Sequence, residues 1–342
     1  MREISIQKNE AGQRMDKFLA KYLNKAPKSF FYKMMRKKNI TLNGKKAVGN
    51  EQLKQGDVIK LFLAEETIEN FIDHSQFSKK KASSAKKQTA GKKVQLDILY
   101  EDEAAVFINK PVGMLSQKAS PTDTSLVEYF IDYLLENGKI TEEELHTFHP
   151  SVCNRLDRNT SGIVAAGKTL QALQGLSEMF RDRTLKKYYL CLVKGQVKEN
   201  QRIHGYLVKN EKTNKVMVSQ KKPAEQTKDG KEASAIDTEY KVLARNKETT
   251  LLEVHLITGK THQIRAHLAS IGHPIAGDYK YGNRSFNDAL KKEYGLRSQL
   301  LHAYRLEFPE NCEGDIKQLS GKIIKAPVPA LFERICKAQG VM

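Results

Sequence analysis

A lysine-rich segment at residues 79–93 places the strongest constraint on how this chain folds. It contains seven lysines, no acidic residue and no large apolar side chain. Such a composition cannot bury enough apolar surface to offset the entropy that is lost on ordering. We therefore expect a basic flexible linker over 74–93, one domain over 1–73 and a second domain over 94–342. The linker is either a solvated spacer or a segment that also touches phosphate groups.

The positive charge of the chain is concentrated in its first quarter. The 342 residues carry a formal net charge of +18, and residues 1–93 hold 22 Lys and Arg against 9 Asp and Glu. Such an excess is typical of proteins that bind a polyanion, either nucleic acid or an anionic membrane surface. No apolar run is long enough to span a membrane, and no signal-peptide pattern is present. We therefore expect a cytoplasmic protein without a membrane partner.

Neither the cysteines nor the histidines have the spacing of a metal site. The cysteines lie far apart without a C-x-x-C pair, which predicts reduced and mostly buried thiols. His262 and His267 are five residues apart, so they do not share one helical face as the two ligands of a zinc helix do. We therefore expect no bound metal. The four cysteines are Cys153, Cys191, Cys312 and Cys336.

Residues 13–63 have the pattern of a compact unit with a basic surface. Apolar residues at helical spacing predict a first helix, and Pro27 fits the first turn of a second helix whose exposed face is basic. Residues 40–44 predict a strand that runs into an Asn-Gly turn, and residues 58–63 predict another strand. The apolar residues of the first helix are Met15, Phe18, Leu19, Tyr22 and Leu23.

After the linker, expected strands outnumber expected helices and do not alternate with them regularly. This order predicts an α+β domain with a mixed, mostly antiparallel sheet flanked by helices. Residues 137–150 are polar and are expected to form a connecting loop. Strands are expected over 96–100, 104–111, 163–166, 188–193, 237–244 and 250–256, and helices over 125–135, 170–181, 263–271 and 330–337.

Residues 162–169 match the phosphate-loop pattern G-x-x-x-x-G-K-T. That loop needs a flexible turn after a buried strand, so that its backbone amides point at phosphate groups. Here the four residues between the glycines are Ile-Val-Ala-Ala, which favour a strand, and the residues before them are charged. We therefore expect a strand and no nucleotide cofactor. A second Gly-Lys-Thr at 259–261 lacks the earlier glycine.

Asp157 lies between two arginines just before that expected strand. The guanidinium groups of Arg155 and Arg158 are expected to keep its carboxylate ionised, because a nearby cation lowers the pKa of an aspartate. An ionised carboxylate at the mouth of a sheet suits a nucleophile or a base. By itself, however, the segment fits an ordinary surface charge cluster better.

Residues 154–162, Asn-Arg-Leu-Asp-Arg-Asn-Thr-Ser-Gly, resemble the first signature of the RluA/RluC-type pseudouridine synthases. Two residues depart from it: Asn154 stands where that family usually has His, and Asn159 where it usually has Asp. Gly167 in place of the usual Ala creates the phosphate-loop match. The departures leave Arg155, Asp157, Arg158 and Gly162 in place.

Three later segments resemble this family in the order that it requires. Residues 187–195 are similar to its second motif, in which the tyrosine six residues before the glycine belongs to the active site; here that is Tyr189. Residues 256–278, closed by Tyr281-Gly282, are similar to the third motif and imply Arg265 as the partner of the catalytic Asp. Residues 301–308 are similar to the final core strand. The likeness covers about residues 94–335.

The resemblance implies an isomerase that converts uridine in RNA into pseudouridine through the carboxylate of Asp157. The reaction cleaves the ribose–nitrogen bond and rejoins the ribose through carbon 5 of the rotated base, so it demands no redox cofactor or metal. Arg265 is expected to orient Asp157 as a bidentate pair. Tyr189 is expected to stack on the extruded base and to help move the carbon-5 proton. Further RNA contacts are expected at Arg155, Arg158 and His262, the last of which otherwise organises a helix start.

The first domain resembles the αL RNA-binding module of the S-four type, which is shared with a ribosomal small-subunit protein. The similar segments are residues 14–19, 36–44 and 53–58. The resemblance and the charge excess together imply RNA contact through the basic helix face, although such a face is often only solvated. The expected contacts are Arg36, Lys37 and Lys38.

The substrate is less constrained than the reaction. Similarity to the RluC-type branch implies large-subunit ribosomal RNA, with transfer RNA as the alternative. An alternative class of protein is a catalytically silent RNA-binding or ribosome-assembly factor. That alternative does not explain why Asp157, Tyr189 and Arg265 occur together. Glycoside hydrolysis needs a second acid near Asp157, and this segment supplies arginines instead. We expect a monomer that has RNA as its partner and no cofactor.

Overall fold

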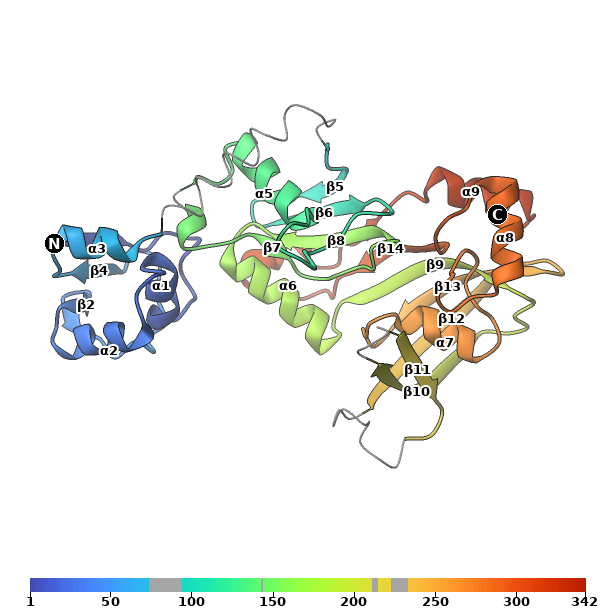
Figure 1. The fold of residues 1–342 in the computed structure, drawn as a ribbon, viewed down its shortest axis with the longest axis horizontal. Helices are drawn as coiled ribbons and strands as arrows, with labels where there is room; N and C mark the ends of the chain where they lie inside the picture. Colours follow the sequence, from blue (N-terminus) through green and yellow to red (C-terminus); the bar gives the residue numbers. More distant parts are fainter. Residues whose placement is uncertain (74–93, 143, 211–214, 223–232) are drawn as a thin grey trace.

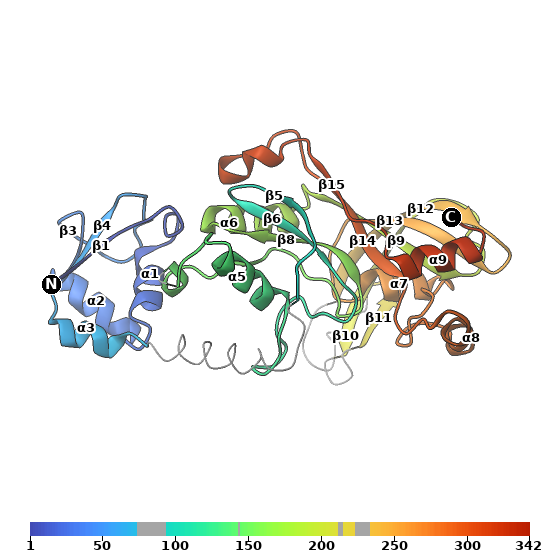
Figure 2. The ribbon, with the colours of Figure 1, turned by 90° about the horizontal axis from the view of Figure 1, so that it is seen from above.

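The computed structural model describes residues 1–73, 94–142, 144–210, 215–222 and 233–342. The described chain forms two units along one long axis, with the N-terminal unit at one end (Figures 1 and 2). The expected linker over 74–93 lies outside the described residues. Within these ranges, no helix has the length and apolarity that crossing a membrane requires.

The first unit packs three helices against a four-stranded antiparallel sheet in the order β1-β4-β2-β3. A single apolar core joins the helices to the sheet. The strands are β1 (Arg2–Ser5), β2 (Ile40–Leu42), β3 (Lys45–Lys46) and β4 (Val58–Leu61). The helices are α1 (Met15–Tyr22), α2 (Lys28–Arg36) and α3 (Glu65–Phe71).

Local sequence explains most of this first unit. The apolar spacing correctly predicts α1, whereas Pro27 is the extended residue that precedes α2, so that helix begins one residue later than expected. Asn43 and Gly44 have φ angles of 50° and 73°, as a two-residue hairpin turn requires. The sequence does not predict α3, because Ile68 is its one buried residue and its first turn is acidic.

The second unit is built on one eleven-stranded sheet, in which β14 and β8 pair in parallel and the other described pairs are antiparallel. The main order is β11-β10-β12-β13-β9-β14-β8-β6-β5, with β15 on β14 and β7 on β8. This confirms the α+β class with a mixed, mostly antiparallel sheet. The strands are β5 (Ile98–Glu101), β6 (Ala105–Lys110), β7 (Ser151–Val152), β8 (Ser161–Gly167), β9 (Lys186–Lys194), β10 (Gln201–Asn210), β11 (Lys215–Ser219), β12 (Ser234–Arg245), β13 (Thr249–Leu256), β14 (Leu301–Glu307) and β15 (Ile323–Lys325).

Helices cover both faces of this sheet, because alternate residues of its strands face separate cores. Val106 and Ile108 of β6 pack on one face with α5 and α7, whereas Ala105 and Phe107 pack on the other face with α6. A third core joins β9 to α8 and α9 (Figure 2). The helices are α5 (Leu126–Glu136), α6 (Leu170–Asp182), α7 (Gln263–Ser270), α8 (Arg284–Tyr294) and α9 (Ala330–Ala338).

The sequence does not predict β10, β11 and α8. Polar residues and Gly205 interrupt the apolar alternation of β10, and α8 buries only Asn287 and Leu290 among its eleven residues. Neighbouring strands and loops therefore hold these elements in place more than their own apolar spacing does.

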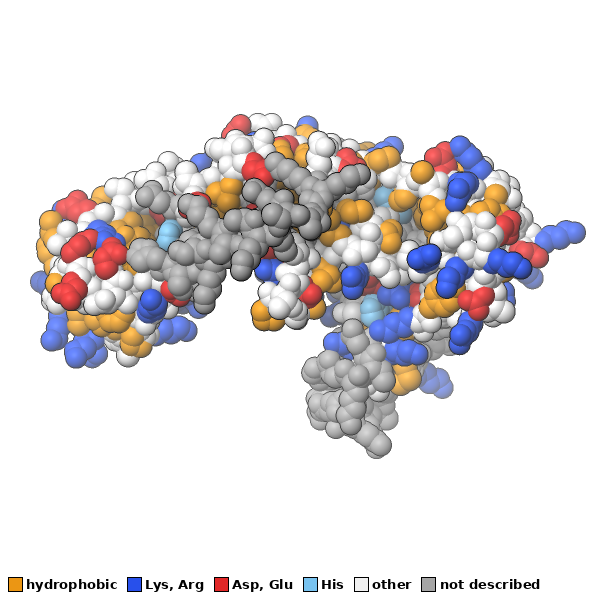
Figure 3. Space-filling view, turned by 45° about the horizontal axis from the view of Figure 1, so that its top comes forward, with side chains coloured by type: hydrophobic (Ala, Val, Ile, Leu, Met, Phe, Trp, Pro, Cys, Tyr) orange, Lys and Arg blue, Asp and Glu red, His pale blue; other side chains and the backbone are white. Residues whose placement is uncertain are grey.

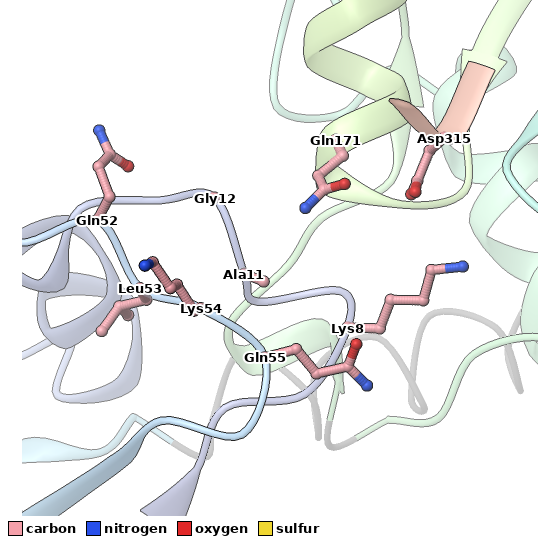
Figure 4. Close-up of a pocket in the computed structure, with 9 residues that line it drawn as sticks. All are labelled: Lys8, Ala11, Gly12, Gln52, Leu53, Lys54, Gln55, Gln171 and Asp315. Atoms are coloured by element: carbon pink, nitrogen blue, oxygen red, sulfur yellow. The ribbon is translucent and has the colours of Figure 1, made fainter. Parts of the chain in front are cut away.

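The expected loop at 137–150 contains a short 3₁₀ helix (Glu144–His146) and forms a contact between the two units. Asn9 Nδ2 donates to Glu144 Oε1 at 3.0 Å, and Thr147 Oγ1 donates to Glu10 Oε1 at 2.6 Å. Glu10 and Thr147 are both buried. A cavity of about 490 Å³ lies between the units; Figure 4 shows its lining from both sides, including Lys8 and Lys54 of the first unit and Gln171 and Asp315 of the second.

A fully buried histidine lies where β14 meets β8. His302 is in register with Ser161, and its Nδ1 lies 2.9 Å from Ser161 Oγ. Burial lowers the pKa of His302 from 6.5 to about 4. The unfolded chain therefore binds this proton at a higher pH than the folded chain does. Stability is consequently lost as the pH falls from 6.5 towards 4.

We expect the titration of His302 to lower the free energy of unfolding by up to about 3 kcal/mol as the pH falls from about 7 to about 4. One pKa unit corresponds to about 1.4 kcal/mol. Urea unfolding of the wild-type and His302→Gln proteins at the two pH values measures this, since Gln does not titrate. The exposed His204 provides a control, and His204→Gln should keep the wild-type dependence. Equal pH dependence in the wild-type and His302→Gln proteins would contradict the expectation.

Candidate active site

Asp157 lies on the loop between β7 and β8, and buried hydrogen bonds hold the backbone of that loop. Ser116 Oγ donates to Leu156 O at 2.9 Å and accepts from Leu156 N at 3.0 Å. Thr160 N donates to Asp157 O at 3.0 Å, which closes a tight turn. The side chain of Asp157 is 26% exposed. The carboxylate is thus held by a rigid loop and is still accessible to a ligand.

Arg265 of α7 connects Asp157 to a second, buried carboxylate. Its Nη1 donates to Asp157 Oδ2 at 2.7 Å, while Nε and Nη2 donate to the two oxygens of Asp278 at 2.7 and 3.0 Å. Burial works against the positive charge, but Asp278 and then Asp157 raise the pKa of Arg265 above its ordinary value. Burial opposes the charge of Asp278 as well, and the hydrogen bond from Arg265 nevertheless lowers the pKa of that carboxyl group. All three groups therefore form one fixed ionic cluster.

Two details of this cluster differ from what we expected of the sequence. The bidentate pair of Arg265 is with Asp278, and its bond to Asp157 is single. Arg155 and Arg158 are exposed, and Arg158 Nε donates to Gly113 O at 3.1 Å. Within the described residues, Asp157 forms an ion pair with Arg265, and the imidazole of His262 lies 3.9 Å from the same carboxylate. The turn directs the neighbouring arginines outward, so the cation comes from a distant helix.

Tyr189 and Tyr188 point to opposite faces of β9, as alternation along a strand requires. Tyr189 is 8% exposed and belongs to the core beneath α5 and α7. Burial, and then the charge of Asp157, raise the pKa of Tyr189, so its phenol is neutral at neutral pH. Tyr188 instead stacks on His255 and lies under Arg305 at 4.0 Å. Of the two tyrosines, Tyr189 therefore shares the surroundings of Asp157.

His262 precedes α7 with a left-handed backbone, φ 55°. Its Nε2 lies 3.9 Å from Asp157 Oδ2, and its Nδ1 lies 2.9 Å from the hydroxyl of Tyr281. Burial lowers the pKa of His262. The ring of Tyr281 also lies against Arg265, with the guanidinium carbon 5.2 Å from the ring centroid. His262 thus lies at the start of α7, as expected if it organises that helix start, and it faces the carboxylate of Asp157.

Asn154, which departs from the family signature, continues the hydrogen bonding of β8. Its Nδ2 donates to Ile163 O at 3.2 Å, and its Oδ1 accepts from Ala165 N at 2.8 Å. An amide can make both bonds because it has a donor and an acceptor side by side. Residues Ser161–Gly167 form β8 and are all buried, which confirms that the phosphate-loop match is false.

Lys110 is fully buried behind the loop that carries Asp157. Its Nζ donates to the carbonyl oxygens of Pro111, Met114 and Arg158 at 3.0, 2.8 and 3.2 Å. Burial lowers the pKa of Lys110 to about 8, although the charge of Asp157 opposes this shift. The ammonium group therefore remains charged at neutral pH and ties residues 110–114 to the loop.

The sequence does not reveal the parts that Lys110, Ser116, Asp278 and Tyr281 play. Asp278 and Tyr281 lie at the end of the third motif, and their place in that motif was the only indication in the sequence that they belong to the site. His262 and His267 have separate partners, since His267 Nδ1 lies 3.0 Å from Thr238 Oγ1. In the part of the chain that the structure describes, no three His, Cys, Asp or Glu side chains converge on a site for a metal ion.

Comparison with known proteins places this chain in one family. A family model described as RNA pseudouridylate synthase matches residues 104–270. The ribosomal large subunit pseudouridine synthase C of Vibrio parahaemolyticus is 32% identical over 97% of this chain and 94% of that protein. The chain therefore belongs to the RNA pseudouridylate synthase family, whose members are isomerases that convert uridine in RNA into pseudouridine.

Other relatives bear the same particular name. Proteins called ribosomal large subunit pseudouridine synthase C from Vibrio vulnificus and Salmonella typhi are 33% and 32% identical to this chain. The matches cover 89% and 94% of this chain and 87% and 93% of those proteins. The solved structure of human RNA Pseudouridylate Synthase Domain Containing 4 shares the fold, with a TM-score of 0.57, 23% identity, and coverage of 72% of this chain and 94% of that chain.

Replacing Lys110 with Met should lower the free energy of unfolding by about 1–3 kcal/mol, because buried carbonyl groups lose their donor. Urea unfolding at about pH 7 measures the change. Lys118→Met is the matched control, since Lys118 is 37% exposed and pairs with Glu128 on the surface. If the two variants were equally stable, the hydrogen bonds of Lys110 would not hold the loop.

Proposed function

We propose that this enzyme isomerises uridines of large-subunit ribosomal RNA and that Asp157 is its catalytic carboxylate. The observation that carries the proposal is the 2.7 Å ion pair by which buried Arg265 orients a partly exposed Asp157. The names of the Vibrio relatives support ribosomal RNA as the substrate. Transfer RNA is the alternative that the experiments below distinguish.

The chemistry needs an ionised and fixed carboxylate. The N1–C1′ bond breaks, the base rotates, and carbon 5 bonds to C1′ while N1 gains the proton that carbon 5 loses. Asp157 supplies an electron pair, either by attacking the nucleotide or by removing a ribose proton. Arg265 and His262 both approach Oδ2, so Oδ1 is the oxygen that reacts. Arg265 keeps the carboxylate charged and oriented in either route.

Tyr189 acts as a neutral phenol in this proposal, because burial and the charge of Asp157 raise its pKa. A neutral phenol offers a ring face for stacking and an O–H group for a hydrogen bond. An extruded uracil needs such a face, since it leaves its stacked neighbours before the reaction. Tyr189 therefore holds the base beside Asp157.

RNA is held by cations on both units. Arg36, Lys37 and Lys38 are exposed at the carboxyl end of α2, and Figure 3 shows Lys and Arg side chains gathered along the lower edge of the first unit. We infer that this unit is an RNA-binding module of the S-four type. Arg155 and Arg158 are exposed beside Asp157 and contact phosphate groups near the target.

We also propose that the protein acts as a monomer in the cytoplasm, without a metal or cofactor. The support is that a single chain supplies Asp157, Tyr189 and Arg265, and that the reaction neither gains nor loses electrons.

Replacing Asp157 with Asn should reduce pseudouridine formation on the order of a thousandfold or more, because the amide cannot supply the electron pair. Pseudouridine in a large-subunit ribosomal RNA transcript measures the loss. Asp182→Asn is the control, since Asp182 is a surface carboxylate that pairs with exposed Arg181. Full activity of Asp157→Asn would exclude this residue as the catalytic group.

The substrate is decided by mapping pseudouridines in total RNA from a strain that lacks the protein. Loss of a ribosomal site supports the proposal, whereas loss of a transfer RNA site alone overturns the choice of substrate. A wild-type protein that forms no pseudouridine on any cellular RNA would identify a catalytically silent RNA-binding factor instead.

Replacing Arg36, Lys37 and Lys38 together with Gln should weaken RNA binding and make it less dependent on salt. Each lost phosphate contact changes the slope of log K against log salt by about 0.7–0.9, so three contacts change it by about 2–3. Filter binding at several salt concentrations measures this slope.

A matched variant replaces Lys317, Lys322 and Lys325 of the second unit with Gln and removes the same total charge. It should keep the wild-type slope. Equal slopes for the wild type and the α2 variant would show that the basic end of α2 does not contact RNA.

A further inference from the structure

Tyr281 connects three parts of the molecule around Asp157. Its hydroxyl oxygen accepts from Val216 N of β11 at 3.0 Å and lies 2.9 Å from His262 Nδ1. Its ring packs against Arg265, with the guanidinium carbon 5.2 Å from the ring centroid. Tyr281 therefore touches both of the residues whose charged or polar groups approach Asp157 Oδ2.

The hydrogen bonds of the Tyr281 hydroxyl group bear on which ring nitrogen of His262 carries the proton. The amide of Val216 can only donate, so the Tyr281 oxygen accepts there and its own proton is available for one other partner. His262 Nδ1 lies within reach of that proton, and it can accept the proton only if it carries none of its own. In a neutral imidazole the proton is consequently on Nε2.

The charge state of His262 agrees with this assignment. Burial lowers the pKa of His262; Arg265 and Lys280 lower it further, while Asp157 and Asp278 oppose the shift. The ring is therefore neutral at neutral pH and carries a single proton.

Nε2 is the ring nitrogen of His262 that faces Asp157. It lies 3.9 Å from Asp157 Oδ2, which is too far for a direct hydrogen bond. The His262 side chain is 11% exposed. A donor that is fixed beside the catalytic carboxylate recognises an acceptor on the nucleotide, and the carbonyl oxygens of uracil are such acceptors.

We propose that Tyr281 is a positioning residue that holds His262 as the neutral Nε2–H tautomer, and that His262 donates this hydrogen bond to a carbonyl oxygen of the target uracil. The inference rests on the proposed function of Asp157. It adds a contact to the reacting base and a reason for the left-handed backbone of His262, which places the imidazole at the start of α7.

The ¹⁵N NMR spectrum of protein with labelled histidine imidazoles tests the tautomer directly, with the His262 signals assigned from the spectrum of His262→Gln. The wild-type protein at about pH 7.5 should show His262 protonated on Nε2 and unprotonated on Nδ1. Tyr281→Phe should shift these signals towards a mixture of tautomers, because Nδ1 loses its donor. Protonation of wild-type His262 on Nδ1 would overturn the proposal.

Kinetics test the contact with the base. Tyr281→Phe should lower kcat about tenfold, the effect of one hydrogen bond, while KM for RNA changes little. Tyr279→Phe is the matched control, because Tyr279 is 47% exposed and donates to Asp288 at 3.0 Å. It should leave kcat and the His262 signals unchanged. Unchanged kcat and signals in Tyr281→Phe would overturn the positioning role.

Two variants at position 262 separate donation from packing. His262→Gln keeps an N–H donor at a similar place and should retain more activity than His262→Leu, which has none. Equal kcat in the two variants would overturn donation to the base even if the tautomer is the expected one. If the wild-type protein forms no pseudouridine on any RNA, the proposed function fails, and the spectrum still decides the tautomer independently.

Discussion

A buried guanidinium needs compensating charge, because an unpaired cation in the protein interior is very costly. Arg265 obtains it from Asp278 along the Nε and Nη2 edge and from Asp157 through Nη1. Since Asp278 holds the guanidinium at two points, the third nitrogen is aimed at the loop between β7 and β8. Asp157 is oriented by this one bond, which uses its Oδ2 atom. The positions of three distant segments therefore depend on this one ionic cluster.

The cluster also bears on where the protein carries the positive charges that attract RNA. A catalytic carboxylate repels the phosphates of an RNA strand, and the buried charge of Arg265 is already matched by Asp157 and Asp278. Attraction for RNA must come from other parts of the surface. In the proposed function, the 15 Lys and Arg among residues 1–73 provide it at the far end of the molecule, and exposed Arg155 and Arg158 provide it beside Asp157. The proposed function thus assigns RNA binding and catalysis to separate charged groups.

The contact between the two units relates these functions in space. Thr147 donates to the buried carboxylate of Glu10, and the neighbouring pair of Asn9 and Glu144 adds a second hydrogen bond. A buried carboxylate that loses its donor is destabilised, so this contact favours one orientation of the units. The basic end of α2 then has a defined position relative to Asp157.

The sequence by itself determined the elements whose apolar residues repeat with the spacing of a helix or a strand, such as α1, α6 and β8, and it excluded a phosphate loop at 162–169. It also predicted Asp157, Tyr189 and Arg265 as the catalytic set through four segments in the right order. Only the tertiary structure decided which groups meet. Arg265 reaches Asp157 across 108 residues of chain, whereas the adjacent Arg155 and Arg158 turn outward. The burial of Lys110, the bidentate role of Asp278 and the link from Tyr281 to His262 are likewise invisible in the spacing of residues. Periodicity reports which side chains are buried, but hydrogen bonds and ion pairs depend on distances of a few ångströms that the packing of remote segments sets.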